Sequence, residues 1–308
     1  MRTNNKFMSY KSMLSKGIKL EQELISNSAP NSNSSLTSTS NFSINDSFSS
    51  LANFFHANGY IIINDVVSND VLEKLRNDLY KVENHGLTKL NKKQQAKHQM
   101  HKCFFEKSPE MVKFIGENKL IDFVQYLIGD VPGNRGNTLT AHLIHNNAFI
   151  VPSEGRGQAP SWHTDDALQN VILPEGYVLP NKIKLPVMVV TCMIWLSDCS
   201  TVENGPTFVV PGSHRFGQIV DPEYAELNKV PMCGKAGSVV ILNNQLWHRG
   251  CENTSTIGRE TIQISFGRRI VSHMFKTIMD YQMPVHVIKG MSDKTKERFG
   301  YLQGGAYS

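Results

Sequence analysis

Several features that mark other protein classes are missing from this chain of 308 residues. No apolar run approaches the roughly 20 residues that a membrane-spanning helix needs, and no internal repeat is evident. The five cysteines are odd in number, widely spaced and never arranged as CxxC, which argues against a disulfide framework and a structural zinc site. The formal net charge is +5, yet no basic block is long enough to indicate nucleic-acid binding.

The N-terminal segment has little material for a core. Ser, Asn and Thr dominate residues 25–50, a composition typical of a flexible arm. Residues 1–20 are basic, contain no acidic residue and lack the apolar centre of a secretory signal. They fit either an organelle transit peptide or a solvated amphipathic helix. We therefore expect residues 1–50 to form a flexible arm. We also expect a cytoplasmic protein, or an organellar one if the arm is a transit peptide.

The next part of the chain predicts one strand and then helices. Residues 59–63 resemble a short buried strand, and apolar residues at helical spacing predict a helix over 70–82. Two further helices are expected at 108–116 and 118–129. The first of these two begins with Ser108 followed by proline, a combination that caps helices.

From residue 137 onward, short runs rich in Val, Ile, Thr and Phe are separated by turn residues, which favours a sandwich, jelly roll or barrel. The expected strands are 138–151, 186–196, 207–210, 238–242 and 261–270. In the last strand Thr261, Gln263 and Ser265 share one face. Arg259 has the same parity, so it points into a pocket if that face lines one.

Two short motifs offer metal ligands. On an extended segment, His163 and Asp165 project to the same side and can reach one ion. His248 follows another expected strand and supplies a second imidazole. Two histidines and one carboxylate can hold one face of an octahedral iron and leave three positions open. Each motif alone is also compatible with an ordinary surface pair.

Arg259 lies eleven residues after His248, at the start of the last expected strand. Its guanidinium can clamp a carboxylate through two parallel hydrogen bonds, which a lysine cannot reproduce. The alternative for an isolated arginine at a strand start is a surface ion pair.

Taken in order, these motifs resemble the phytanoyl-CoA dioxygenase-like (PhyH) family of Fe(II)/2-oxoglutarate-dependent oxygenases. The resemblance covers roughly residues 50–270 and rests on Trp162-His163-Thr164-Asp165, Asn204-Gly205-Pro206 with Pro211-Gly212-Ser213-His214, Trp247-His248-Arg249-Gly250, and Arg259. It implies a double-stranded β-helix (jelly roll, cupin-like) core packed against N-terminal helices. We thus expect a mainly β fold with helical additions, forming one domain over 51–308 with a C-terminal extension.

The resemblance also implies an activity. His163, Asp165 and His248 would be the catalytic iron ligands, and Arg259 would bind 2-oxoglutarate. Fe(II), 2-oxoglutarate and O2 would oxidise an unactivated C–H bond by hydroxylation, desaturation or ring closure, with release of succinate and CO2. Related halogenases replace the carboxylate with a small residue, so Asp165 favours oxygenase chemistry. The alternatives are a zinc-dependent hydrolase and a non-catalytic jelly-roll binding protein.

The sequence indicates the substrate less clearly than it indicates the metal ligands. The strand with His142, His145, Asn146 and Asn147 should pass near the metal, so some of these residues are candidates for the pocket; they fit a solvated strand face equally well. Of the candidate pocket residues we single out His145, together with Gln263 on the last strand. The basic balance, together with Arg156, Arg268 and Arg269, favours a small anionic substrate, either amino-acid-derived or another specialised metabolite. We expect neither a nucleic-acid partner nor a membrane span, and we take a monomer as the default state.

Overall fold

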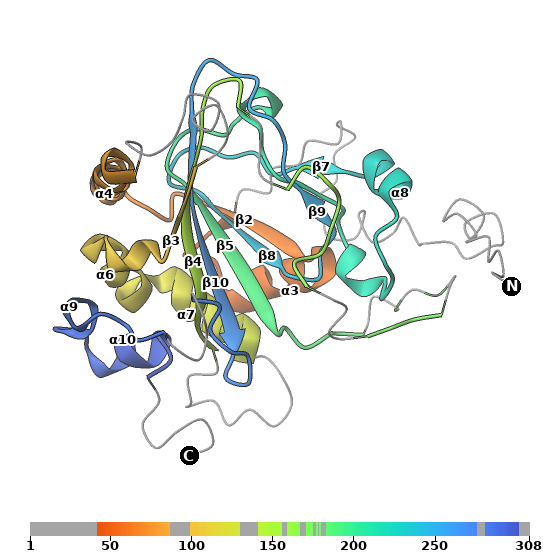
Figure 1. Cartoon of the computed structure of the whole chain (residues 1–308). Coiled ribbons are helices and arrows are strands. Elements are labelled where there is room, and N and C mark those ends of the chain that lie inside the picture. The colour runs from red at the N-terminus through yellow and green to blue at the C-terminus, as the bar shows by residue number, and fades with distance from the viewer. Residues whose placement is uncertain are drawn as a thin grey trace, which may run out of the picture.

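The computed structural model describes residues 42–86, 99–129, 141–155, 159–166, 171–174, 177, 179, 183–275 and 281–301. Its centre is a seven-stranded sheet (Figure 1). The strand order is β1 (Phe42–Ser43), β2 (Tyr60–Asn64), β8 (Val239–Asn243), β5 (Val189–Trp195), β10 (Arg259–Arg268), β4 (Ala141–Val151) and β3 (Gln99–Lys102). All neighbours are antiparallel except β1 and β2.

A smaller sheet completes the core. It contains β7 (Val230–Pro231), β6 (Phe208–Val209) and β9 (His248–Arg249), and the short helix α8 (Pro222–Leu227) lies beside it (Figure 1). The family fold expected from the sequence, a cupin-like β core with added helices, is confirmed. The two sheets matter for function because the candidate metal ligands come from the side of the small sheet.

Helices cover the opposite face of the large sheet (Figure 1). They are α3 (Phe48–Asn58), α4 (Asn69–Gly86), α6 (Pro109–Glu117) and α7 (Lys119–Gly129). The predicted cap is present, since the Ser108 hydroxyl accepts a hydrogen bond from Met111 N with proline at the first helical position. The apolar face of α7 packs into the main core against the large sheet, as its helical spacing predicts.

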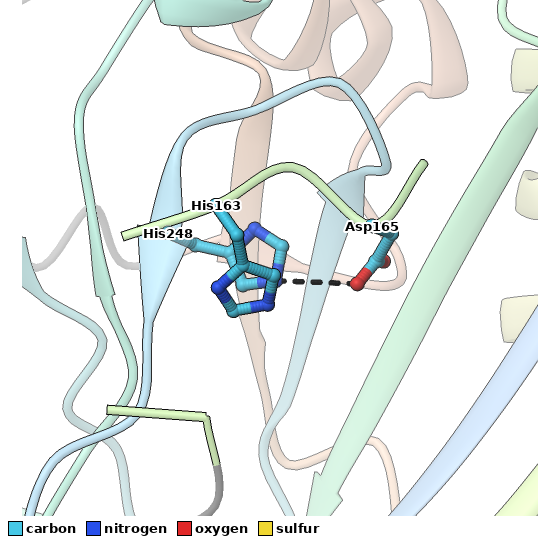
Figure 2. Close-up of side chains that lie close together, drawn as sticks. All are labelled: His163, Asp165 and His248. Carbon is cyan, nitrogen blue, oxygen red and sulfur yellow. Dashed lines mark ion pairs between the residues drawn. The ribbon is translucent and has the colours of Figure 1, made fainter. Parts of the chain in front are cut away.

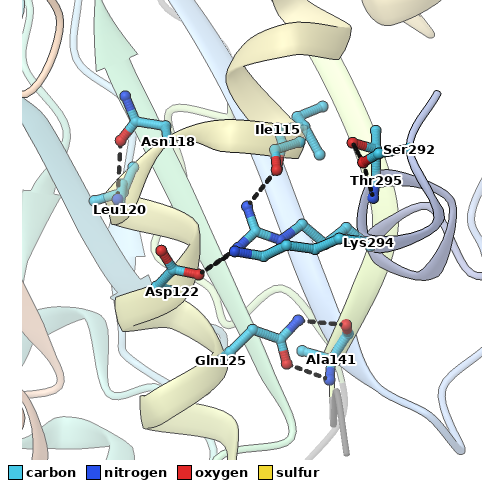
Figure 3. A network of polar contacts seen from close by, with 11 residues as sticks. Ile115, Asn118, Leu120, Asp122, Gln125, Ala141, Ser292, Lys294 and Thr295 are labelled. Atoms are coloured by element: carbon cyan, nitrogen blue, oxygen red, sulfur yellow. Dashed lines mark hydrogen bonds and ion pairs between the residues drawn. The ribbon is translucent and has the colours of Figure 1, made fainter. Parts of the chain in front are cut away.

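The C-terminal helices α9 (Val285–Ile288) and α10 (Asp293–Arg298) dock onto α6 and α7. Arg298 is fully buried, donates to the carbonyl oxygens of Ile115 and Gly116, both at 3.0 Å, and forms an ion pair with Asp122. Figure 3 shows this network, in which Lys294 Nζ also lies 3.1 Å from Asp122 Oδ1. The extension is therefore an integral part of the described fold.

The start of the folded region differs from the sequence prediction in one boundary and one helix. The flexible arm expected over residues 1–50 gives way to structure at Phe42, because β1 pairs with β2 and Ser47 caps α3. α3 was not predicted, since its apolar residues directly follow the polar arm and share its serine-rich composition. Residues 1–41, and with them the possible targeting segment, lie outside the described residues. Among the residues that are described, no helix is long and apolar enough to cross a membrane.

Candidate metal centre

Backbone pairing brings the two candidate histidine ligands together. His163 and His248 form an antiparallel bridge in which each backbone N–H donates to the other's carbonyl oxygen, at 3.0 and 2.9 Å. Asp165 N donates to Asn244 O at 3.1 Å, which fixes the carboxylate one step further along. The ring centroids of the histidines are 4.3 Å apart. The sequence predicted these three residues as one cluster, and the structure places them together (Figure 2).

Each imidazole ring is oriented by a hydrogen bond between its Nδ1 atom and a backbone carbonyl oxygen. His163 Nδ1 lies 2.8 Å from Ser161 O, and His248 Nδ1 lies 2.8 Å from Leu246 O. A ring nitrogen facing a carbonyl carries the proton, so Nε2 is the atom that each ring, when neutral, offers to a metal. Each of the three side chains offers one ligand atom within 4.8 Å of the others. The donor set of two neutral imidazoles and one carboxylate fits Fe(II).

The charges in the cluster favour the metal-binding protonation states of two of its members. The pKa of Asp165 is lowered, because the His248 hydrogen bond and the nearby imidazoles outweigh burial, which alone would raise it. Burial and the charge of His248 lower the pKa of His163. The pKa of His248 is raised: burial lowers it, but the hydrogen bond and charge of Asp165 prevail. A bound cation would replace the proton on His248, which contacts Asp165 at 3.3 Å.

A cavity of about 160 Å³ opens between the two sheets at this cluster. Arg259, Thr261 and Gln263 all line it, so the predicted parity of the last strand is correct. Burial lowers the pKa of the Arg259 guanidinium from its usual value, although an arginine remains charged in proteins. Among the described residues no carboxylate pairs with Arg259. The cavity therefore contains a cation that has no counter-ion among the described residues.

The remaining predicted residues differ in where they lie relative to the cavity. His145 is half-buried on β4, near enough to Asp165 for the two charges to interact. Arg268 donates to Ile128 O at 3.0 Å and so serves the end of α7 rather than the cavity. Arg156 lies outside the described residues. His214 is buried, with Nε2 3.1 Å from His56 O and a pKa lowered to about 3 by burial, which suits a structural histidine.

Two features of the site were not predicted from the sequence. Trp195 and Met193 line the cavity from β5, where their chemistry gives no more signal than any buried strand. Glu260 is 5% exposed on the other face of β10 and accepts from Arg76 Nε at 2.6 Å and from the Tyr80 hydroxyl. This ion pair ties α4 to the residue next to Arg259, a long-range contact that no local pattern reveals.

Comparisons with known proteins agree with this geometry. An uncharacterised protein of Mycobacterium tuberculosis is 28% identical over 72% of this chain and 75% of its own length. The phytanoyl-CoA dioxygenase of Arabidopsis thaliana is 24% identical over 68% of this chain and 85% of its own. HygX from Streptomyces hygroscopicus, crystallised with nickel, 2-oxoglutarate and hygromycin B, has a TM-score of 0.54 at 16% identity, covering 72% of this chain and 87% of HygX.

The HygX likeness shows a shared fold, whereas the family is decided by sequence. Residues 55–261 match the family model described as phytanoyl-CoA dioxygenase (PhyH). This match decides against the zinc hydrolase and the non-catalytic binding protein. The chain belongs to the phytanoyl-CoA dioxygenase family and is a 2-oxoglutarate-dependent oxygenase that uses Fe(II), 2-oxoglutarate and O2.

Proposed function

We propose that this oxygenase oxidises an unactivated C–H bond of a small anionic substrate, amino-acid-derived or another specialised metabolite, and releases succinate and CO2. The observation that carries the proposal is the shared cavity. It contains three convergent ligand atoms within 4.8 Å of one another and, in the same walls, the guanidinium of Arg259, which no described carboxylate pairs with. The product is an alcohol when the substrate is hydroxylated, and an alkene or a ring when a second hydrogen is removed instead.

The residues divide the work as follows. His163, Asp165 and His248 would hold Fe(II), which when bound supplies the activation of O2 that the protein groups cannot. Their backbone hydrogen bonds keep the ligand atoms directed to one point. Arg259 would anchor the far carboxylate of 2-oxoglutarate with its planar pair of donors. Phe149, Val151 and Trp195 exclude water from the cavity walls, which strengthens every charge interaction inside.

Anaerobic titration tests the metal and co-substrate assignment. Adding Fe(II) and 2-oxoglutarate together should produce a weak visible charge-transfer band that neither additive gives alone. A parallel assay measures succinate over a panel of amino acids, hydroxy acids and neutral analogues. A band together with succinate formation stimulated by anionic compounds supports the proposal. Absence of the band, with zinc-dependent hydrolysis in its place, would contradict it.

A further inference from the structure

A row of polar side chains crosses three strands on the cavity face of the large sheet. In the antiparallel register Lys102 of β3 lies opposite Asn147 of β4, and Asn147 lies opposite Gln263 of β10. Directly paired residues project to the same face, and Gln263 lines the cavity. Lys102, Asn147 and Gln263 therefore face the same space as the metal cluster; we call them the polar row.

Asn147 is the most informative member of the polar row. Its side chain is 2% exposed, and its Nδ2 donates to His145 Nε2 at 2.8 Å. Its Oδ1 is buried and accepts no hydrogen bond from any residue that the structure describes. An acceptor left in this state costs about 1–3 kcal/mol. Such an arrangement is expected where a bound molecule supplies the missing N–H or O–H donor.

The side chains of Gln263 and Lys102 also have no hydrogen-bond or ion-pair partner among the described residues. The Gln263 amide makes no hydrogen bond within the described residues, although its backbone carbonyl accepts from Asn146 Nδ2 at 2.9 Å. Lys102 is exposed at the sheet edge and has no ion pair with any described carboxylate. Arg268 is engaged by Ile128 O, which leaves Lys102 as an unpaired cation at this edge of the described sheet.

Position and spacing point to a small ligand. Gln263 lines the same cavity as His163, Asp165 and His248, which places the polar row beside the metal cluster. Neighbouring strands lie about 4.8 Å apart, so Lys102 and Gln263 are separated by roughly 10 Å across β4. Arg259 lies four residues before Gln263 on the same face of β10 and is left for the co-substrate.

We propose that the polar row binds the primary substrate, and that this substrate is an amino acid or hydroxy acid. Lys102 pairs with its carboxylate, Asn147 Oδ1 accepts from its amino or hydroxyl group, and Gln263 holds the adjoining polar atom. The carbon skeleton is thereby held on the metal side of the polar row. This inference rests on the proposed function, because it assigns the substrate side of the same site.

Calorimetric titration of the anaerobic protein, loaded with Fe(II) and 2-oxoglutarate, tests the inference. The probes are matched pairs of amino or hydroxy acids and their primary amides, which differ only in the charge that Lys102 would meet. We expect at least one acid to bind roughly tenfold more tightly than its amide. Lys102→Met should abolish that preference, whereas Lys235→Met, at an exposed lysine outside the polar row, should keep it.

A second variant separates binding from folding. Asn147→Leu removes the unsatisfied acceptor and also the hydrogen bond to His145. These two changes are similar in size and opposite in sign, so the ligand-free protein should keep its melting temperature while acid binding weakens roughly tenfold. A lower melting temperature with unchanged affinity would make Asn147 a structural residue and overturn the inference. So would a panel in which no acid outbinds its amide, or an acid preference that survives Lys102→Met. If the charge-transfer band is absent as well, the proposed function fails; if the band forms normally, only the polar row does.

Discussion

Arg259 offers a prediction in which stability and function change in opposite directions. The guanidinium is a half-buried cation with no carboxylate partner among the described residues. Arg259→Met should therefore raise the free energy of unfolding of the protein without 2-oxoglutarate. Because the side chain is only half-buried by area, we take the low end of the range for unsatisfied buried groups, about 1 kcal/mol. That corresponds to a rise of roughly 2–4 °C in melting temperature.

When 2-oxoglutarate is bound, the unaltered protein should instead be more stable than Arg259→Met. With Fe(II) present and oxygen excluded, 2-oxoglutarate at one hundred times its dissociation constant should stabilise the unaltered protein by about 2.7 kcal/mol. That is a shift of roughly 5–11 °C, and Arg259→Met should lose it. Arg259→Lys keeps the charge but loses the planar fork, so its KM for 2-oxoglutarate should rise roughly tenfold to a hundredfold.

Differential scanning calorimetry with and without 2-oxoglutarate measures both effects. Arg268→Met is the matched control, because this arginine lies on the same strand but donates to Ile128 O. It should lower the melting temperature and leave the co-substrate shift unchanged. Two results would refute the reasoning: a full 2-oxoglutarate shift in Arg259→Met, or a loss of stability in that variant without ligand.

Three further changes have defined outcomes. Asp165→Ala should weaken Fe(II) binding more than about 100-fold, because the loss of a residue that only hydrogen-bonds to a metal ligand already costs up to about that much. Equilibrium dialysis measures the affinity, and unchanged binding would remove Asp165 from the ligand set. Glu260→Gln weakens the pair with Arg76, whose side chain is partly exposed, and should reduce stability by about 1 kcal/mol. It should also raise the KM for 2-oxoglutarate, because β10 loses its tie beside the anchoring arginine. Burial lowers the pKa of His142 to about 4, whereas an unfolded histidine titrates near 6.5. The unfolded chain then takes up the proton first, so stability should fall between about pH 6.5 and 4, by about 2 kcal/mol at pH 5 relative to pH 7. In urea unfolding, His142→Asn should lose about 2 kcal/mol less than the unaltered protein between pH 7 and pH 5, because other buried histidines such as His214 still contribute. The exposed His286→Asn should lose as much as the unaltered protein.

The sequence was most informative where a local pattern coincided with a chemical requirement. The two-residue alternation of the last strand placed Arg259 and Gln263 on the cavity face, and the i, i+2 spacing placed His163 beside Asp165. The cap at Ser108 set the start of α6 correctly. In each case the signal depends on neighbours in the chain, which periodicity captures.

The contacts that complete the site were not predictable in that way. β3 contains Lys102 in the sequence Gln-Met-His-Lys, which has no strand-like apolar alternation, and it becomes a strand only by pairing with β4. The unsatisfied oxygen of Asn147 is visible only once the surrounding side chains are placed. α10 is six residues long and is held by the buried Arg298, a contact that spans more than 170 residues of sequence.

The bridge between His163 and His248 has a consequence for how the protein acquires its metal. The bridge is formed by backbone hydrogen bonds, so the ligands His163 and His248 are already neighbours before any ion binds. Small zinc domains, in contrast, draw much of their folding energy from the metal itself. This chain should therefore fold and be purified without iron, and the ion should exchange with the folded state. Occupancy in a cell would then depend on which divalent metal is supplied, and a preparation lacking activity would be recoverable by adding Fe(II) under reducing conditions.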